Sequence, residues 1–439
     1  HGFLAAGPAL RADALSIVFV VPTAFLYLTT AIFAAGYLHL PEGTAGRRYA
    51  RRFYAGLNLF CWAMVVAPLV NGLALLWVAI EVTTVVSALL VAIDDTDGAT
   101  EAAWKYVLIA SLGLGIALLA TIVMYYAGTK VFGSSYNLSY PALLAGAHRF
   151  PPDAVRLADI LAVIGFGTKM GLVPVHTWLP DAHSEAPTPI SALLSGALLA
   201  TSFYAILRFF QVSMRALGPT FPRNVLLAFG LASLLLAALY LLSQRDLKRL
   251  LAYSSVEHMG ILAIGMSFSA PLAIVGVLLH VIAHGAAKGT AFFGAGSVVR
   301  KFLTKDLLRI RGGIALLPWS GTMLVLAVLA LSGMPPFGIF RSEFLIVSGG
   351  LSDPHDAVAA ILVVLVTLAF FGLSWFTTET MVTPAPPRLV ATLGRGETSW
   401  FIVVAMVLGL AGLVVLGVHV PGQLSVLLHH AATELEVTR

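Results

Sequence analysis

Charged side chains are scarce in this sequence. Only 11% of its 439 residues are Asp, Glu, Lys or Arg, whereas 59% are hydrophobic, and the mean hydropathy is +0.92. Soluble domains carry about 25% charged residues. The composition therefore excludes an ordinary soluble domain and indicates an all-α protein that crosses a membrane many times.

Cysteine is almost absent, and the common nucleotide-binding loops are missing. The single cysteine, Cys61, excludes an internal disulfide and a cluster held by four thiolates of this chain. No GxxxxGK[ST] loop occurs, and "GFGTKMG" at 165–171 lacks the GxGxxG spacing and lies in an apolar stretch. We therefore expect no cofactor, no metal and no redox or catalytic centre in this chain, so any enzymatic activity would belong to a complex that contains it.

Long stretches with few charges are abundant. A helix of about 20 residues crosses a hydrocarbon core of about 30 Å, and the sequence contains twelve stretches of this kind. We predict twelve transmembrane helices, which cover 13–40, 53–71, 72–93, 102–127, 157–178, 187–210, 223–243, 247–268, 270–299, 313–349, 356–379 and 398–420.

Prolines interrupt two of these stretches. The stretch 313–349 is too long for one plain helix and contains "SGMPPFG" with Pro335 and Pro336, and Pro174 lies near the end of 157–178. A proline removes a backbone donor and clashes with the preceding turn, and helices broken at matching places are typical of inverted-repeat transporters. We predict two half-channel repeats at 53–210 and 223–379. A membrane helix with a basic inside loop precedes them at 1–52, and a loop with the last membrane helix follows at 380–439.

Basic residues are distributed unevenly between the two sides of the spans. The side that holds the basic loop at 47–52 has 15 Lys and Arg, and the other side has 8 when the predicted loop at 208–223 is counted with it. The positive-inside rule places the richer side inside and both ends of the chain outside. The pI of about 9.3 reflects these clusters and not a stripe for nucleic acid. The first residue is His1, and no signal-peptide pattern follows it, so we expect the natural start to lie upstream.

A few ionisable residues lie inside the predicted spans. Each costs about 2.5–3.5 kcal/mol on insertion scales, so such residues usually face protein or water and mark an ion path. Lys169 lies near the first proline break, and a nearby carboxylate would change its proton affinity; we therefore expect Glu81 to lie close to it. The residues that we assign to proton translocation are Glu81, Lys169, His280, His284, Lys288 and Glu343.

Three of these residues follow one another at intervals of four. On a helix, His280, His284 and Lys288 form one polar stripe about 12 Å long, which favours a proton wire leading to Glu343. Two alternatives stay open. The groups could join helices by hydrogen bonds, or the HxxxH pair could bind a metal, although a lysine on the same face and the lack of an obvious third ligand argue against it.

Further polar residues near the spans are candidates for an accessory proton path. Lys105 follows a glutamate by four residues, so a surface ion pair also explains it. The two histidines after the first break lie in a predicted inside loop, where a funnel for protons and a solvated loop are equally consistent with the sequence. Glu257 and His258 lie deeper in a predicted span and could join the proton wire. These candidates are Lys105, His176, His183, Glu257 and His258.

Several of these motifs resemble one membrane protein family. The motifs are the lone Glu81, "TKMGLVPVHTWLPDAHSEAPTP" with Lys169, "RDLKRLLAYSSVEHMG", the stripe from His280, and "GMPPFGIFRSEF" with Glu343. Together they resemble the antiporter-like subunits of respiratory complex I, multisubunit sodium/proton antiporters and membrane-bound hydrogenases. "WVAIEVTT", "EAAWKYVLI", "GFGTK" and "SEAPTPISALLSG" are most similar to hydrogenase-4 component F. The resemblance covers about residues 50–420.

The resemblance implies a fourteen-helix fold with broken seventh and twelfth helices, of which this chain would contain helices three to fourteen. It also implies that protons move along the intramembrane residues named above. One position departs from the family pattern, because complex I relatives commonly have a second central lysine where "GALLATSFYAILRF" has Ala200. The link between the half-channels would then run through water, His258 or the stripe from His280.

The sequence therefore predicts a proton-translocating subunit of a hydrogenase-4-like, energy-converting oxidoreductase complex. The alternatives are a sodium/proton antiporter subunit, a complex I-type NADH dehydrogenase subunit and, in another class, a structural scaffold that does not pump. The expected partners are other membrane subunits, a soluble redox arm, protons and lipids, without nucleic acid. We expect the chain in a bacterial or archaeal cytoplasmic membrane.

Overall fold

The computed structural model describes residues 9–38, 40, 42–133, 136–352 and 356–436. His1, on which the expectation of an upstream start depends, and Arg439, which was counted with the outside residues, lie outside these ranges. The described residues form helices without a named strand. The helices are α1 (Ala14–Tyr37), α2 (Thr44–Val66), η1 (Ala67–Leu69), α3 (Leu73–Val91), α4 (Asp97–Phe132), α5 (Tyr140–Gly146), η2 (Ala147–Arg149), α6 (Pro152–Met170), α7 (Trp178–Glu185), α8 (Thr188–Leu193), η3 (Leu194–Leu198), α9 (Leu199–Leu217), α10 (Thr220–Leu241), α11 (Leu247–Phe268), α12 (Pro271–Phe302), α13 (Gly313–Leu316), α14 (Ser320–Leu331), α15 (Gly338–Leu351), α16 (Asp356–Met381), α17 (Pro387–Leu393), α18 (Trp400–Val418) and α19 (Gly422–Leu435).

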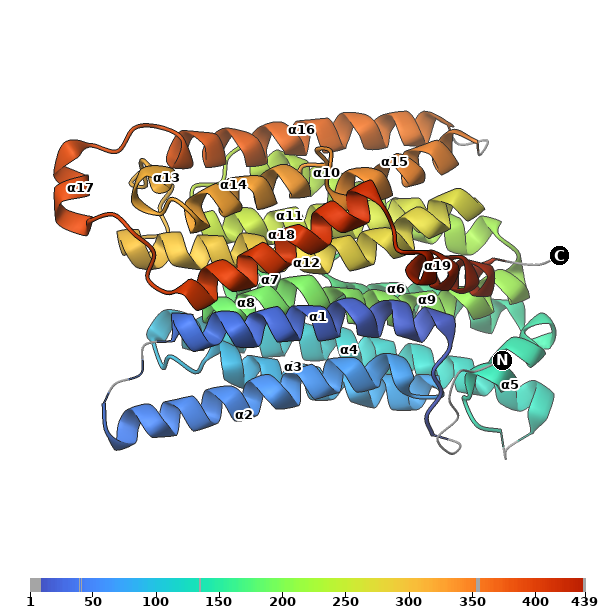
Figure 1. The fold of residues 1–439 in the computed structure, drawn as a ribbon. Helices are drawn as coiled ribbons and strands as arrows, with labels where there is room; N and C mark the ends of the chain where they lie inside the picture. The colour runs from blue at the N-terminus through green and yellow to red at the C-terminus, as the bar shows by residue number, and fades with distance from the viewer. Residues whose placement is uncertain (1–8, 39, 41, 134–135, 353–355, 437–439) are drawn as a thin grey trace.

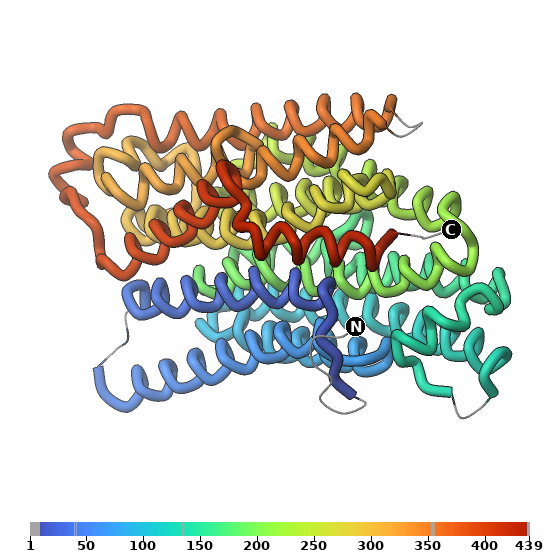
Figure 2. The backbone as a smooth tube through the Cα atoms, turned by 45° about the vertical axis from the view of Figure 1, so that its right-hand side comes forward, coloured from blue at the N-terminus to red at the C-terminus, as the bar shows by residue number. Residues whose placement is uncertain are grey.

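The long helices lie side by side along one common direction (Figure 1). The start of α2 and the short α17 lie at one end of the bundle in both views (Figure 2), whereas the start of α1 and helix α19 lie toward the other end in Figure 1. The predicted inside loops and the first and last described helices' outer ends are thus separated along the bundle. This arrangement agrees with the polarity that the basic residues indicate.

The apolar stretches predicted from the sequence all overlap helices. Nine helical segments of the described chain are long and apolar enough to cross a membrane. Helices α6 and α11 are not among them, because several polar residues interrupt their apolar sequence, and α14 has only 12 residues. The fold class is confirmed, and the exact count of twelve spans stays a prediction.

Both predicted interruptions occur. Helix α6 ends at Met170 and α7 begins at Trp178, with Pro174 between them. Helix α14 ends at Leu331 and α15 begins at Gly338, with both prolines of "SGMPPFG" in the gap. The span predicted to continue to 178 therefore stops eight residues earlier, because the chain turns out of the helix at Gly171. The division into half-channel repeats and flanking segments stays a prediction.

Two helical segments form the interior of the bundle. In the most apolar part of α12, 89% of the residues are buried. In the most apolar part of the run from α8 through α9, all residues are buried. Helix α12 contacts α1, α11, α14, α15 and α18. Because these segments are surrounded by protein, their polar side chains meet other side chains and not lipid.

A buried ion pair joins the first described helix to α9. Asp13 caps the start of α1 through the Ser16 backbone N–H, and the Arg208 guanidinium donates to both of its carboxylate oxygens at 2.6 Å. Glu434 of α19 accepts from the N–H groups of Ala14 and Leu15 at the same helix start. This cluster holds α1, α9 and α19 together.

Arg208 corrects one prediction from the sequence. It was counted in an outside loop at 208–223, but α9 continues to Leu217 and Arg208 lies inside it with 2% of its surface exposed. The ion pair with Asp13 compensates the positive charge of the buried Arg208. The bias of basic residues toward the inside does not depend on it.

We expect Arg208→Ala to lower the stability of the chain by about 3–5 kcal/mol, because it leaves Asp13 as an uncompensated buried charge. The thermal unfolding midpoint of the purified chain in detergent measures the effect. Arg215→Ala is the matched control, since Arg215 is an exposed arginine of the same helix. Equal midpoints for the two variants would contradict a stabilising role for the Asp13–Arg208 pair.

Candidate functional site

Lys169 lies at the last turn of α6 and is completely buried. Its amine donates to the Thr84 hydroxyl of α3 at 2.8 Å and to the Tyr106 hydroxyl of α4. Tyr106 in turn shares a hydrogen bond of 2.7 Å with Ser87. Lys169 is therefore held by neutral hydroxyl groups in the interior of three packed helices.

The helix end beside Lys169 is closed by side chains. Gly171 has φ +87°, a conformation that glycine adopts without strain. The Trp178 indole donates to the Thr168 carbonyl at 2.7 Å, and the Val173 N–H donates to the Ser233 hydroxyl at 2.9 Å. The backbone groups that the break releases are thus satisfied by neighbouring helices, as a break within a membrane requires.

Glu81 lies on α3, one turn before Thr84. Its negative charge acts on Lys169, although neither of the two hydrogen bonds found for the amine goes to Glu81. Its Oε2 atom is buried and has no hydrogen-bond partner in the described part of the chain, and the residue as a whole is half-buried. The expected neighbourhood of Glu81 and Lys169 is present, with Glu81 toward the edge of the bundle.

The segment after the first break is not a solvated loop, contrary to one of the two interpretations of the sequence. It forms α7, in which Trp178 and His183 are fully buried. The Trp178 ring lies 4.5 Å from the Tyr106 ring and 6.1 Å from the His183 ring. His176 is also buried, beside the Tyr253 ring at 6.5 Å. Apolar surface on α7 explains the difference, because it packs down onto α4 and α11.

Charged residues cover α7 at its exposed side. Lys105 pairs with Glu101 at 2.6 Å, as its spacing predicts, and also with Asp181 at 3.3 Å. Arg249 of α11 pairs with Asp181 at 2.5 Å. Lys105 thus belongs to a surface ion cluster that holds α7 on the bundle, which favours the surface interpretation of this residue.

A second buried lysine lies in α12. Lys288 donates to the Leu251 carbonyl of α11 at 3.0 Å and to the Ser254 hydroxyl. The charge of Glu257 acts on Lys288, and the Oε2 atom of Glu257 has no hydrogen-bond partner among the residues that the structure covers. Lys169 and Lys288 thus have similar surroundings, since each amine donates to at least one hydroxyl group and one carboxyl group lies nearby.

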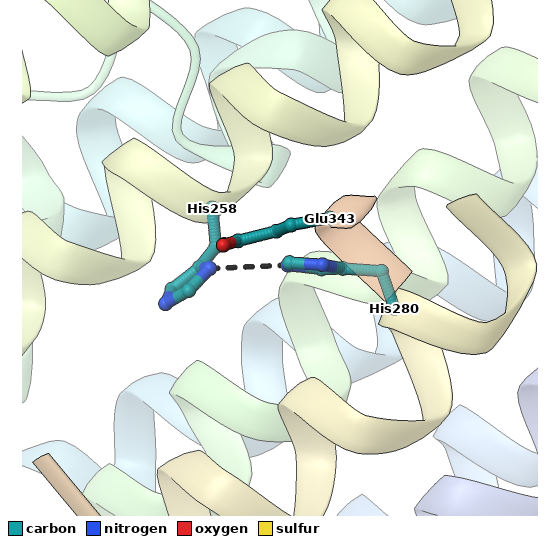
Figure 3. Close-up of side chains that lie close together, drawn as sticks. All are labelled: His258, His280 and Glu343. Carbon is teal, nitrogen blue, oxygen red and sulfur yellow. Dashed lines mark hydrogen bonds between the residues drawn. The ribbon is translucent and has the colours of Figure 1, made fainter. Parts of the chain in front are cut away.

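The predicted stripe on α12 faces the interior. His280, His284 and Lys288 are all completely buried. His258 Nδ1 and His280 Nε2 lie 3.0 Å apart in a hydrogen bond, and His280 Nδ1 lies 2.9 Å from the Ser342 hydroxyl (Figure 3). The rings of His258 and His284 are 5.1 Å apart. His258 therefore joins the stripe, as one hypothesis from the sequence proposed.

Glu343 lies at the far end of this group, on α15 just after the second break. Its carboxylate reaches toward His258 and His280 (Figure 3), and one ligand atom from each of the three residues lies within 4.8 Å of the others. Gly333, with φ +67°, makes room for it, because a Cβ at this position would overlap Glu343 Oε2. The stripe thus reaches Glu343, as expected.

Ala200 leaves no ionisable side chain in the first turn of α9. It is buried and follows the π-helical turn η3, whose Gly196 packs closely against Gly285 of α12. His183 lies between the two lysine groups instead. Its ring is 5.9 Å from the Phe292 ring of α12, and the charge of Lys288 acts on it.

Two polar residues near the site were missed by the reasoning from sequence. Tyr106 follows Lys105 directly, and only the fold shows that it points inward to Lys169. Asp159 is buried in α6, ten residues before Lys169, and its Oδ2 atom has no hydrogen-bond partner within the described ranges. Its place inside the predicted span 157–178 was the signal that could have revealed it.

A family model described as "NADH:quinone oxidoreductase/Mrp antiporter, TM" matches residues 70–372. The chain belongs to this family. The matched region contains both helix breaks and the buried Lys169 and Lys288, so the family match covers the site described above.

Curated relatives of the antiporter-like family support this membership. The chain is 37% identical over 359 residues to a hydrogenase-4 component F homolog of Methylacidiphilum infernorum, which covers 81% of this chain and 75% of the relative. It is 30% identical over 348 residues to hydrogenase-4 component B of Escherichia coli, with 76% of this chain and 50% of the relative covered. NADH-quinone oxidoreductase subunit N of Desulforudis audaxviator is 31% identical over 369 residues, with 83% and 71% covered.

Solved structures share the fold at low sequence identity. A chain of respiratory complex I from Thermus thermophilus is similar with a TM-score of 0.82 and 24% identity, covering all of this chain and 90% of that one. A chain of the Mrp complex from Dietzia has a TM-score of 0.83 and 20% identity, with 98% and 86% covered. The antiporter-like fold is therefore shared across these complexes.

We expect Gly333→Ala to destabilise the second break and displace Glu343, because the added Cβ overlaps its carboxylate. Gly394→Ala is the matched control, since Gly394 has the same φ of +67° but open space around it. Both variants carry a backbone cost of about 1–2 kcal/mol, so the extra loss in Gly333→Ala reports the contact with Glu343. Thermal unfolding in detergent compares the two, and equal midpoints would show that Glu343 does not depend on this approach.

Proposed function

We propose that this chain is a proton-translocating, antiporter-like membrane subunit of a hydrogenase-4-like oxidoreductase complex, of the group 4 nickel–iron hydrogenase or formate hydrogenlyase type. The observation that carries the proposal is Lys169, which is completely buried at a helix end, donates to Thr84 and Tyr106, and has Glu81 nearby. A lysine in such surroundings exchanges its proton when a neighbouring charge changes.

The proposed route has two parts. The first contains Glu81, Lys169 and Tyr106. The second runs from Lys288 along the stripe through His258 and His280 to Glu343. The hydrogen bond of 3.0 Å between His258 and His280 supports the second part, and Ser342 holds the His280 ring in place at 2.9 Å without belonging to the route.

His183 is the proposed link between the two parts. It would serve instead of the central lysine that relatives have at the position of Ala200, because Ala200 cannot carry a proton. Its Nε2 atom is buried without a hydrogen-bond partner in the described chain, and its ring lies between Trp178 and Phe292. An imidazole with a free nitrogen can accept and pass on a proton.

The energy for transport would come from partner subunits. Moving one proton against 100 mV costs about 2.3 kcal/mol, and the sequence contains no nucleotide loop or thiolate set that could supply it. Half-buried Glu81 lies on α3, whose outward side exposes Val78, Val82 and Val85. An apolar face with one carboxylate suits a neighbouring membrane subunit whose charge acts on Glu81. A soluble redox arm and a bacterial or archaeal cytoplasmic membrane belong to the same proposal.

Two rival functions are distinguishable. A sodium/proton antiporter would favour several hard oxygen ligands, whereas the buried groups described around Lys169 and Lys288 are largely amines, imidazoles and hydroxyls. A scaffold without pumping is favoured by Ala200 alone. No cofactor or resident metal is part of the proposal.

We expect Lys169→Ala to reduce redox-driven proton translocation by the intact complex at least about tenfold, because the exchangeable amine is lost. Proton uptake into inverted membrane vesicles is the measurement, with the amount of assembled complex determined in parallel. Lys130→Ala is the control, since Lys130 is an exposed lysine at the outer end of α4. Unchanged translocation in a fully assembled Lys169→Ala complex would favour the scaffold.

We also expect the isolated chain to be inert when it is reconstituted in liposomes under an imposed sodium gradient. The reason is that the proposed coupling needs a partner's charge at Glu81. A fluorescent pH probe inside the liposomes reports proton movement. Robust sodium-dependent proton exchange without partners would mean an autonomous antiporter and would refute the coupling model.

A further inference from the structure

We propose that His258, His280 and Glu343 form a binding site for a divalent transition-metal ion of the zinc class, and that the bound ion blocks the second part of the proton route. The blocking effect rests on the proposed function, whereas binding of the ion does not. The sequence offered the HxxxH pair of α12 without a third ligand. The fold instead brings one histidine of that pair to a histidine of α11 and a glutamate of α15.

The donor set suits this class of ion. Two imidazoles and one carboxylate bind zinc in many proteins and leave one position open. One donor atom from each of the three residues already lies within 4.8 Å of the other two, and the two ring nitrogens are 3.0 Å apart. Donors at about 2.0–2.1 Å from zinc in a tetrahedron are about 3.4 Å from one another. Closing the remaining gap requires the Glu343 carboxylate to move toward the two ring nitrogens.

The surroundings also favour an ion here. His280 Nδ1 bonds to Ser342, which fixes the orientation of the ring so that Nε2 points at the site, as outer partners of metal ligands do. Glu343 Oε1 is buried without a hydrogen-bond partner in the described chain. The charge of Glu257 acts on Glu343, and Lys288 is the cation that acts on the cluster. The unpaired Glu343 oxygen beside two histidines thus offers an incoming ion a ligand atom that no other group in the described chain uses.

A cavity with a largely apolar wall adjoins the site. Its volume is about 450 Å³, and Glu343 lies in its wall together with Ser332 and Gly333 of the second break. Glu343 therefore borders this cavity and also lies beside the two histidines (Figure 3). An ion bound between the three residues displaces the proton that His258 and His280 share. A water molecule would fill the fourth position.

The test uses the purified full-length chain with Co²⁺ as a spectroscopic probe and Zn²⁺ as competitor. We expect one Co²⁺ per chain with the visible absorption of a four-coordinate ion, which Zn²⁺ abolishes. His280→Ala and Glu343→Gln should each remove this absorption. Ser342→Ala should weaken binding about 10- to 100-fold while leaving the ligands in place. His429→Ala, which removes an exposed histidine of α19, is the control that keeps the signal.

The outcomes separate this proposal from the proposed function. Absence of the four-coordinate signal in the folded wild-type chain, or its persistence in His280→Ala and Glu343→Gln, overturns the metal site. In the complex, micromolar Zn²⁺ should inhibit proton translocation, and Ser342→Ala should raise the required concentration about 10- to 100-fold. Binding of Co²⁺ with no inhibition overturns the blocking role. Absence of proton translocation before any metal is added overturns the proposed function and leaves the binding result standing.

Discussion

The cost of placing ionisable groups inside a membrane governs this structure. Lys169, Lys288, Glu257 and the histidines of α12 are enclosed by helices, and hydroxyls, carbonyls and imidazoles meet the polar atoms of Lys169, Lys288 and His280. Since each such group would cost several kcal/mol in lipid, the bundle surrounds them with protein, most completely along α12 and the run from α8 to α9. The outer helices carry the apolar surface that faces lipid or partner subunits.

The two helix breaks follow from the same constraint. A helix end within the membrane exposes backbone groups that must find partners, and at the first break Trp178 and Ser233 provide them. The break ends α6 directly after Lys169, whereas at the second break Gly333 lets the Glu343 carboxylate approach. Each break thus combines an irregular backbone with one ionisable side chain, which is how membrane proteins build ion sites from discontinuous helices.

Membership in the antiporter-like family accounts for the scaffold, but individual residues distinguish this chain. Ala200 removes a titratable group from the centre, and buried His183 lies where a connection is needed. The ion cluster of Lys105, Asp181 and Arg249 holds α7, and therefore His183, in place. The proposed connection through His183 would consequently depend on the surface ion pairs of Asp181, which lies on the same short helix α7.

The sequence by itself determined the membrane class, the helical stretches, both breaks and the presence of Lys169, the α12 stripe and Glu343 as costly intramembrane charges. These follow from composition and spacing, which act locally along the chain. Tertiary structure alone decided that Tyr106 reaches Lys169, that His183 is buried, that Arg208 pairs with Asp13 and that His258 meets His280. Such contacts join residues 22 to 195 positions apart, and the packing of whole helices, which no local pattern encodes, brings them together.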